Sequence, residues 1–528
     1  MLSIDLKLEQ TREMLCSEAR LATISVWLKR RYEMIFSQFW KFKLLPSHPD
    51  HPGIISDRIF IENDNTLELL EHYHGIRVAY KDMKDTEEII NIAAQELKKG
   101  LPIAVEINDL YFPWVPEKKK DDSLFPCFVT GISEDEIFCL DIHGIKKSAP
   151  IPKSDFLKGY EGCITFSAVS NEKDKIDWHT VIAHNTTYLI ENNSFEAMRE
   201  LAKLITDSIN DKTEVSELDA LCYKIKYIYH SRYLFSQFLE YLINQHQSDA
   251  LVEYKDRFVF LSHQWLSLWG LISSTLVQHK LNISADFPYA RLRSVAGKLC
   301  NIADLEENLC RDMINTLEGL AVSSPTVYKA SNKDLHTDRL QYYHFVDLTD
   351  YLNNNGFHSN TGTCTAASLT LTGQVFLTKG LPMEPVWNTH GMKFHFPYPV
   401  DGKDNNISCL GQKIMLQKEC YSYLMFLGCA EWGHYSELME IHYLDGTVSR
   451  SPLEFTDWSY PDSHFGEYVV WEGACGEKDN DGKLQFSKFL KVHLYASALQ
   501  LDSGRELDYI GLPDCSNIHI FAITLGKQ

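Results

Sequence analysis

The chain has 528 residues, with 51 Lys plus Arg against 72 Asp plus Glu and a formal net charge of −21. At roughly 150 residues per domain, this length predicts about three or four domains, each able to bury a core. A hydrophobic share of 44% and a charged share of 23% exclude global disorder. The acidity argues against a nucleic-acid partner, because affinity for phosphate comes from clustered Lys and Arg.

Signals for a membrane or an oxidising compartment are missing from the sequence. No stretch reaches the roughly 18 apolar residues of a transmembrane helix, and residues 1–10 lack the unbroken apolar core of a signal peptide. The 13 cysteines are scattered, with no pair at the spacing that zinc ribbons use. We therefore expect a cytoplasmic protein with reduced thiols, no metal and no cofactor. Its oligomeric state is left open.

The first zone, residues 1–172, mixes helical and strand patterns. Apolar residues at helical spacing predict a long buried helix over Glu18–Phe39 and a second over Asp85–Lys99, with Gly100 in the C′ position that ends helices. Short apolar strands follow at Pro102–Ile107, Cys127–Gly131, Ile137–Ile142 and Gly162–Ala168. The polar turn 133–136 makes the middle two a hairpin. This is an α+β pattern.

The second zone, residues 173–322, has few Pro and Gly residues and predicts a helical bundle. Amphipathic helices or helical pairs are expected over Phe195–Asn210, Glu214–Gln247, Arg257–His279 and Ala290–Glu318. An aromatic stripe in the second of these is expected to be core: Tyr227, Tyr229, Tyr233, Phe235, Phe238 and Tyr241. We interpret the polar residues 323–342 as a linker between the second and third zones.

The third zone, residues 343–528, changes to short β-rich segments separated by turn signals such as Asp401-Gly402 and Asp445-Gly446. Regularly spaced short strands of this kind indicate an antiparallel β-sandwich with a jelly-roll-like character. The predicted fold class is therefore a multidomain α+β protein with a helical bundle and a C-terminal sandwich.

The most informative motif for chemistry lies near the start of the chain. Gln10 precedes Cys16 by six residues, and Cys16 opens a predicted helix. In papain-type thiol enzymes a Gln at this spacing helps to form the oxyanion hole, and the amides of a helix N-terminus favour the thiolate. Asp141, on the predicted hairpin, fits the position that orients the general base.

At these residues the chain resembles the N-terminal domain of the butirosin biosynthesis protein H family, which is papain-like and related to bacteriocin-processing cysteine peptidases. The Cys16 helix opening, the Gly100–Trp114 stretch and the hairpin from Phe128–Gly131 to Asp141 carry the resemblance. It continues through Trp265–Leu281 and Ala296–Leu317, to about residue 320. The family implies acyl transfer from a carrier-protein thioester to an amine through a Cys thioester, in antibiotic or non-ribosomal peptide pathways of bacteria.

The sequence departs from this family at the general base. The family His is expected just before the Phe128–Gly131 strand, where this chain has Phe125 and Pro126. Without a neighbouring imidazole Cys16 should keep a thiol pKa near ~8.5, and Glu18 should oppose the thiolate further. His143, two residues after Asp141, is the alternative base, although an exposed turn position also explains it. The competing interpretation of Cys16 is a small buried hydrophobe on a helix.

Residues 343–528 resemble a β-sandwich module appended to bacterial glycosidases. The segments that carry the resemblance are Val346–Gly356, Phe394–Lys403, Gly428–Gly433, Phe455–Trp458 and Leu512–Ala522. The resemblance implies a carbohydrate-associated module or a brace between domains. Trp387, Trp432, Trp458 and Asn388 are of the types that bind sugars, although core positions are commoner for Trp in a sandwich. Glu431 and Asp457 show no metal-ligand spacing and are interpreted as solvated turn residues.

Two hypotheses follow from the sequence. The first is a tailoring protein of a specialised-metabolite pathway that descends from a thiol acyltransferase, with Cys16 as nucleophile, Gln10 at the oxyanion, and Asp141 and His143 around the base. Its partner would be an acyl carrier protein or a pathway enzyme. Carrier proteins are usually acidic, so the net charge of −21 opposes their approach unless a basic patch intervenes, and Lys29–Arg31 on the Cys16 helix and Lys118–Lys120 are the compact basic clusters of the first zone. The alternative is an inactive binding scaffold whose sandwich recognises a carbohydrate or a protein. A glycosidase would need a dedicated catalytic domain with paired carboxylates.

Overall fold

The chain is described by a computed structural model. The structure describes residues 2–9, 14–46, 55–61, 65–81, 86–114, 123–142, 148–173, 175–210, 215–280, 287–319, 337–359, 362–363, 367–370, 373–478 and 483–528. Two compact units emerge. Unit 1 consists of Met1–Lys41, Ile61–Tyr188 and His230–Lys255, and unit 2 of Phe42–Phe60, Leu189–Tyr229 and Asp256–Gln528. The predicted mixture of helix and sheet with a C-terminal β-sandwich is confirmed. The division into domains at residues 172, 322 and 342 stays a prediction.

Unit 1 joins an antiparallel sheet to short helices. The helices are α1 (Cys16–Trp27), α3 (Thr66–His74), α4 (Thr86–Lys98) and α5 (Lys153–Gly159), with 3-10 turns at Glu33–Phe36 and Asp109–Tyr111. The strands are β1 (Leu2–Ser3), β4 (Ile76–Lys81), β5 (Ile103–Asn108), β6 (Leu124–Ile132), β7 (Glu136–Asp141), β8 (Ala149–Pro152) and β9 (Tyr160–Ala168). Their order is β4-β9-β5-β6-β7-β8, and β1 also pairs with β6. The four strands predicted in this zone are confirmed.

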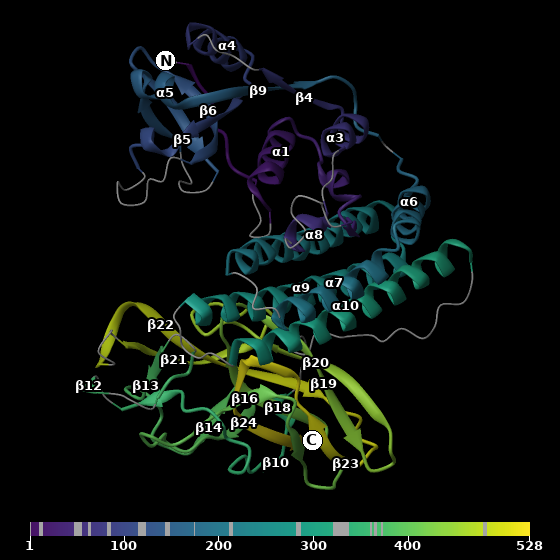
Figure 1. Ribbon diagram of the computed structural model, residues 1–528, viewed down its shortest axis with the longest axis vertical. Helices are drawn as coiled ribbons and strands as arrows, with labels where there is room; N and C mark the ends of the chain where they lie inside the picture. The colour runs from purple at the N-terminus through teal and green to yellow at the C-terminus, as the bar shows by residue number, and fades with distance from the viewer. Residues whose placement is uncertain are drawn as a thin grey trace. The chain divides into compact units, whose positions relative to one another are not determined.

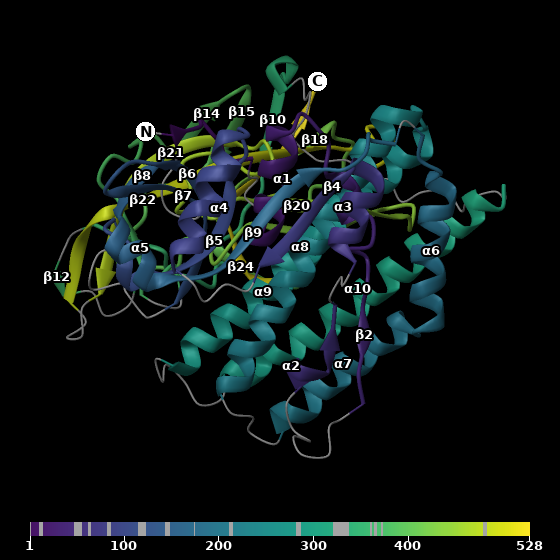
Figure 2. The same ribbon diagram turned by 90° about the horizontal axis from the view of Figure 1, so that it is seen from above.

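The hairpin of β6 and β7 has the predicted turn. The Ser133 amide donates to the Glu136 carbonyl at 2.9 Å, and the register places Cys127 opposite Asp141. Helix α4 covers this sheet with an apolar face that includes Ile89, Ala93 and Leu97 (Figure 2). Gly100 follows the helix at φ +77°, a left-handed conformation that glycine adopts without strain. This helix and its end are therefore confirmed.

The first predicted helix is shorter than expected, which corrects the range Glu18–Phe39. Helix α1 ends at Trp27, where the Lys29 amide donates to the Val26 carbonyl and the Arg30 amide to the Ser25 carbonyl. This is a Schellman closure with Lys29, at φ +56°, in the position that glycine usually takes. Because no Gly or Pro marks the site, helical periodicity alone extended the prediction too far.

Unit 2 contains several helices and a small pair of strands in addition to its sandwich. Its helical segments are α2 (Ile55–Arg58), α7 (Ser194–Asn210), α10 (Phe287–Leu317) and the 3-10 turn Thr337–Arg339, and a small pair joins β2 (Lys43–Leu44) to β3 (Ile59–Phe60). Helices α6 (Trp178–Glu191), α8 (Val215–His246) and α9 (Asp249–Lys280) contribute residues to both units. The helices predicted for residues 195–318 are confirmed to within a few residues at each end, except that α9 begins at Asp249. Tyr229, Phe235, Phe238 and Tyr241 of the aromatic stripe are buried, as predicted.

The sandwich follows in unit 2. Its larger sheet has the order β10-β24-β18-β22-β21-β13-β11, with β12 beside β22 and β16 beside β24; the smaller has the order β17-β23-β19-β20. The strands of the larger sheet are β10 (Tyr342–Phe345), β11 (Phe357–His358), β12 (Gly362–Thr363), β13 (Val375–Leu377), β16 (Ile407–Leu410), β18 (Tyr423–Ala430), β21 (Tyr468–Lys478), β22 (Lys483–Gln500) and β24 (Asp514–Lys527). Those of the smaller are β17 (Lys413–Met415), β19 (Tyr435–Tyr443), β20 (Val448–Phe455) and β23 (Leu507–Gly511), and a separate hairpin joins β14 (Val386–Thr389) to β15 (Met392–His395).

The helices of unit 2 pack on the sandwich. Figure 1 shows α7, α9 and α10 side by side in one layer. The green and yellow strands of the sandwich lie next to this helical layer. The Gln264 side chain of α9 donates to the Ser436 carbonyl of β19, and the Lys298 ammonium of α10 pairs with the Glu437 carboxylate. The sandwich therefore has a helical cover within the same compact unit. In the part of the chain that the structure describes, no helix is long and apolar enough to cross a membrane.

Candidate functional site

Cys16 is the first residue of α1, as the sequence predicts for a papain-type nucleophile. The preceding Leu15 is extended, at φ −74° and ψ 171°, and its carbonyl accepts from the Ala19 amide at 2.9 Å. The Cys16 side chain is half-buried. Gln10, predicted to hold the oxyanion, lies outside the described residues.

The electrostatic surroundings of Cys16 disfavour the thiolate. Burial raises the pKa of the Cys16 thiol above its ordinary value, and the carboxylates of Glu18 and Asp141 raise it further, whereas a backbone hydrogen bond and Arg20 lower it. The net direction is upward, so the helix N-terminus does not outweigh burial and the two carboxylates. These surroundings therefore favour the protonated form of the Cys16 thiol.

Asp141 is the last residue of β7 and is buried. It lies close enough to Cys16 to affect the thiol pKa, and its Oδ2 accepts from the Trp114 indole N–H at 3.3 Å. The structure therefore brings Cys16, Asp141 and Trp114 into one region, although these residues are far apart in the sequence. His143 lies outside the described residues.

The position at which the sequence resemblance predicts a His is occupied by strand residues without a base. Phe125 lies opposite Ile107 and Pro126 opposite Glu106 in the pairing of β5 with β6. Pro126 has no backbone N–H and no titratable side chain, and the Phe125 ring packs edge-on against Phe112 at a centroid distance of 6.4 Å. This strand therefore presents an aromatic ring and a proline where the resemblance predicts an imidazole.

Glu18 is a buried carboxylic acid beside the candidate nucleophile. Its side chain is only 5% exposed, and burial raises the pKa of its carboxyl. Its Oε2 atom has no hydrogen-bond partner among the described residues. Arg20, two residues further on, has a Nη1 atom 3.8 Å from Glu106 Oε1. The sequence predicted the opposition of Glu18 to the thiolate but not the burial of its carboxyl.

Removing the carboxylates should lower the pKa of Cys16. We expect Glu18→Gln and Asp141→Asn each to move the alkylation inflection of Cys16 to lower pH, because each removes a negative charge that raises the thiol pKa. Rates of iodoacetamide labelling against pH, read by mass spectrometry of the Cys16 peptide, measure the shift. Glu134→Gln, in the exposed turn between β6 and β7, is the matched control and should leave the inflection unchanged. An upward shift in either variant would contradict this charge assignment.

The basic cluster Lys29–Arg31 is used inside unit 1, which corrects its placement on the Cys16 helix. It follows α1, and the Arg30 guanidinium donates to the carbonyls of His74 at 2.6 Å, Gly75 at 2.9 Å and Ser170 at 2.5 Å. Arg31 pairs with Glu33. These two cations therefore stabilise the fold, and Lys118–Lys120 lie outside the described residues.

Two of the three tryptophans considered for sugar binding belong to the sandwich core. Trp387 is 4% exposed and Trp458 is 6% exposed, whereas Asn388 is exposed and Trp432 is half-buried. A sugar stacks on an exposed aromatic face. Trp387 and Trp458 do not offer such a face.

Glu431 and Asp457 are not solvated turn residues, which corrects the sequence interpretation. Glu431 is 1% exposed and its Oε1 lies 3.6 Å from His519 Nε2, and Asp457 is 6% exposed. The Asp457 carboxylate accepts from the Gly433 amide at 2.7 Å and from the Ser459 amide at 2.9 Å. Turn-like sequence suggested exposure, but both turns are covered in the fold. Among the described residues no group of three or more His, Cys, Asp or Glu side chains is arranged to hold a metal ion.

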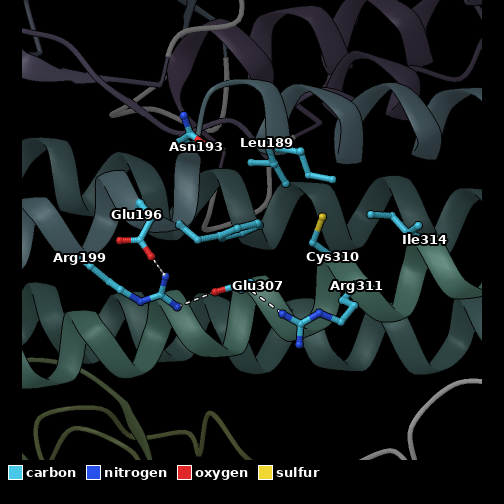
Figure 3. A pocket seen from close by; sticks show the side chains of 10 residues that line it. Leu189, Asn193, Glu196, Arg199, Glu307, Cys310, Arg311 and Ile314 are labelled. Atoms are coloured by element: carbon cyan, nitrogen blue, oxygen red, sulfur yellow. Dashed lines mark hydrogen bonds and ion pairs between the residues drawn. The ribbon is translucent and has the colours of Figure 1, made fainter.

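A cavity of about 280 Å³ lies between the α6–α7 junction and α10 in unit 2. Leu189, Phe195, Cys310 and Ile314 give it apolar walls, and Figure 3 shows Glu196, Arg199, Glu307 and Arg311 joined by ion pairs along one side. Arg199 pairs with Glu196 at 2.7 Å and with Asp304 and Glu307 at 2.6 Å each. Burial raises the pKa of the Cys310 thiol to about 12, so this thiol is inert. The charged groups thus pair with one another.

Comparison with known protein families places a match in the C-terminal part of the chain. Residues 344–528 match the AziU2-like beta-sandwich domain, a family related to natural-product pathways. No curated protein matches the sequence. The match covers the sandwich of unit 2 and does not extend to the region around Cys16.

Proposed function

We propose that this protein acts in a natural-product biosynthetic pathway as a binding component, and that its Cys16 region descends from a thiol acyltransferase but does not use the thiol as a nucleophile. The AziU2-like match supports the pathway assignment. The resemblance of the first 320 or so residues to the butirosin H-type family supports the ancestry, because that family belongs to antibiotic pathways.

One observation carries the non-catalytic assignment. Cys16 has two carboxylates, Glu18 and Asp141, among the groups that raise its pKa, and the strand position of the family base holds Phe125 and Pro126. Thiol catalysis needs a thiolate, which an adjacent base or a positive environment supplies. The surroundings of Cys16 instead raise the pKa of its thiol and so disfavour the thiolate.

The proposed partner is a pathway protein or its bound intermediate, in preference to a free sugar. The buried positions of Trp387 and Trp458 remove most of the aromatic surface that a sugar would need. Calorimetric titration of the full chain with a panel of mono- and oligosaccharides should therefore give no heat of binding. Saturable binding that is lost in Trp432→Ala would restore the carbohydrate alternative.

Replacement of the thiol tests the function directly. A producing strain that carries Cys16→Ser should make the pathway product at an undiminished level, because the thiol is not required. Serine nearly preserves the size of the side chain. Loss of product with normal amounts of folded protein would favour the acyltransferase instead.

The second candidate function is that acyltransferase, which one observation favours: Cys16 opens α1 within electrostatic reach of Asp141. In that reaction the Cys16 thiolate would attack a carrier-protein thioester and release the carrier thiol, and an amine would then displace Cys16 to form the amide. Incubation with an acylated carrier protein should leave an acyl group on Cys16 if this candidate is correct. Our proposal expects no such adduct.

A further inference from the structure

Three histidines from separate parts of unit 2 meet where α9 contacts the sandwich. His263 belongs to α9, His434 to the turn between β18 and β19, and His464 to the loop before β21. The His263 and His464 Nε2 atoms are 3.4 Å apart, and the rings of His434 and His464 stack with centroids 4.4 Å apart and planes 4° apart. His263 and His434 are both buried.

The hydrogen bonds in this cluster require a neutral His434 and at least one neutral ring of the pair His263 and His464. The Asp457 backbone N–H points at His434 Nδ1 at 3.2 Å, and because a backbone N–H can only donate, this nitrogen must carry a lone pair. The Nε2 atoms of His263 and His464 can share one N–H only if one of them is an acceptor. A proton added to His434, or to both of the other rings, removes these contacts and places like charges side by side.

The two carboxylates in these loops, Asp457 and Glu467, already accept hydrogen bonds from backbone amides. Asp457 directs its oxygens to the amides of Gly433 and Ser459, and Glu467 directs its oxygens to the amides of Thr456 and Phe465. Among the described residues, aromatic side chains also pack on the cluster: the Tyr460 ring lies 4.6 Å from that of His434, and the Phe465 ring lies 4.9 Å from that of His263. The electrostatic influences on His263 come from His464 and His434.

We propose that His263, His434 and His464 form a pH-sensitive latch that holds α9 against the sandwich while the rings are neutral and releases it when they are protonated. The latch joins α9 to the two loops of the sandwich that contain the buried residues Glu431 and Asp457. Its release would expose the sandwich surface beneath α9, so the protein would change its available binding surface with pH.

The sign of the pH dependence follows from burial. Burial, and then the two neighbouring histidines, lower the pKa of His263 to about 3, from an ordinary value of 6.5. The folded state therefore binds fewer protons than the unfolded state between these values. Stability is complete above pH ~6.5 and falls as the pH drops towards ~3, by up to tenfold in the folding equilibrium constant for each pH unit.

The test compares the wild-type protein with His263→Gln and with His184→Gln, a control at an exposed position of α6. Between pH 6.5 and 4.5 the folding equilibrium constant of the wild type and of the control should fall about 50-fold more than that of His263→Gln. Denaturant titrations at each pH give the constants. Parallel pH curves for all three proteins would overturn the proposal.

A local measurement covers the case in which His263→Gln fails to fold. Hydrogen exchange of the wild type, corrected for intrinsic rates, should show lost protection at pH 5 relative to pH 7 in peptides covering 258–270, 430–436 and 456–467. Peptides from β22 should keep their protection. His464→Gln removes the ring that faces His263 and should therefore reduce the loss of protection at pH 5. Equal protection at both pH values in the wild type would overturn the latch.

Discussion

Replacing Lys298 by Met is expected to destabilise unit 2 by about 3–5 kcal/mol, because it leaves the Glu437 carboxylate buried without its counter-ion. The two side chains are 10% and 9% exposed, and they connect α10 to β19. Lys298 also donates to Gln264 Oε1 at 3.3 Å, and Gln264 in turn binds the Ser436 carbonyl. The substitution should therefore also weaken the packing of α9 on the sandwich.

Two further variants separate the cost of an orphaned charge from a general defect. The double variant Lys298→Met/Glu437→Leu should recover most of the loss, since replacing both partners of a buried pair by apolar groups is often neutral. Lys99→Met breaks a pair in unit 1 in which the Lys99 side chain is 62% exposed and Glu96 15%, and should change stability by less than about 1 kcal/mol. Denaturant unfolding measures all three. A double variant as unstable as Lys298→Met would show that the pair is not the cause.

Gly270→Ala is the second large effect that we expect, a destabilisation of about 2 kcal/mol. A Cβ at this position of α9 would lie 1.8 Å from the Tyr435 hydroxyl and 3.2 Å from the Trp432 carbonyl oxygen. Alanine favours the helix by about 1 kcal/mol, but Tyr435 is fully buried and its hydroxyl accepts from Asn517 Nδ2 at 2.6 Å. Overpacking of this kind costs about 1–3 kcal/mol and sometimes more. We therefore expect the steric clash to outweigh the gain in helix propensity.

The control for this substitution is Gly297→Ala in the neighbouring helix α10. A Cβ at Gly297 would meet no atom within 4 Å, so helix propensity should act alone and stabilise the protein by up to about 1 kcal/mol. Thermal unfolding of the two variants should therefore shift in opposite directions. Adding Tyr435→Phe to Gly270→Ala should cost less than the sum of the single effects, because it removes the clashing oxygen. Stabilisation by Gly270→Ala would contradict the close approach of α9 to β19.

Local patterns predicted most of the regular structure. The periodicity of Ile89, Ala93 and Leu97 and the stop at Gly100 indicate α4, and the turn at residues 133–136 indicates the β6–β7 hairpin. The end of α1 was predicted wrongly because Lys29 adopts a conformation that the sequence marks only when glycine stands there. The papain-like assignment of unit 1 stays a prediction.

The sites depend on contacts that sequence patterns do not contain. His263, His434 and His464 come from segments about 30 to 200 residues apart, and only packing of α9 on two sandwich turns brings them together. Glu431 and Asp457 were expected to be exposed because they are carboxylates at turns between strands, yet both are buried. In contrast, the spacing of Cys16 and Asp141 relative to a family pattern was visible in the sequence, and the structure places the two residues within electrostatic reach.

The most direct test of the account is the pH dependence of Cys16 alkylation in the full-length protein. Iodoacetamide labelling, followed by mass spectrometry of the Cys16 peptide, gives the rate at each pH, and the partly exposed Cys420 serves as an internal reference. The account predicts an inflection at or above pH ~8.5 and slow labelling at neutral pH. An inflection well below pH ~8.5 would show an activated thiolate and contradict the assignment of Cys16 as a non-catalytic residue.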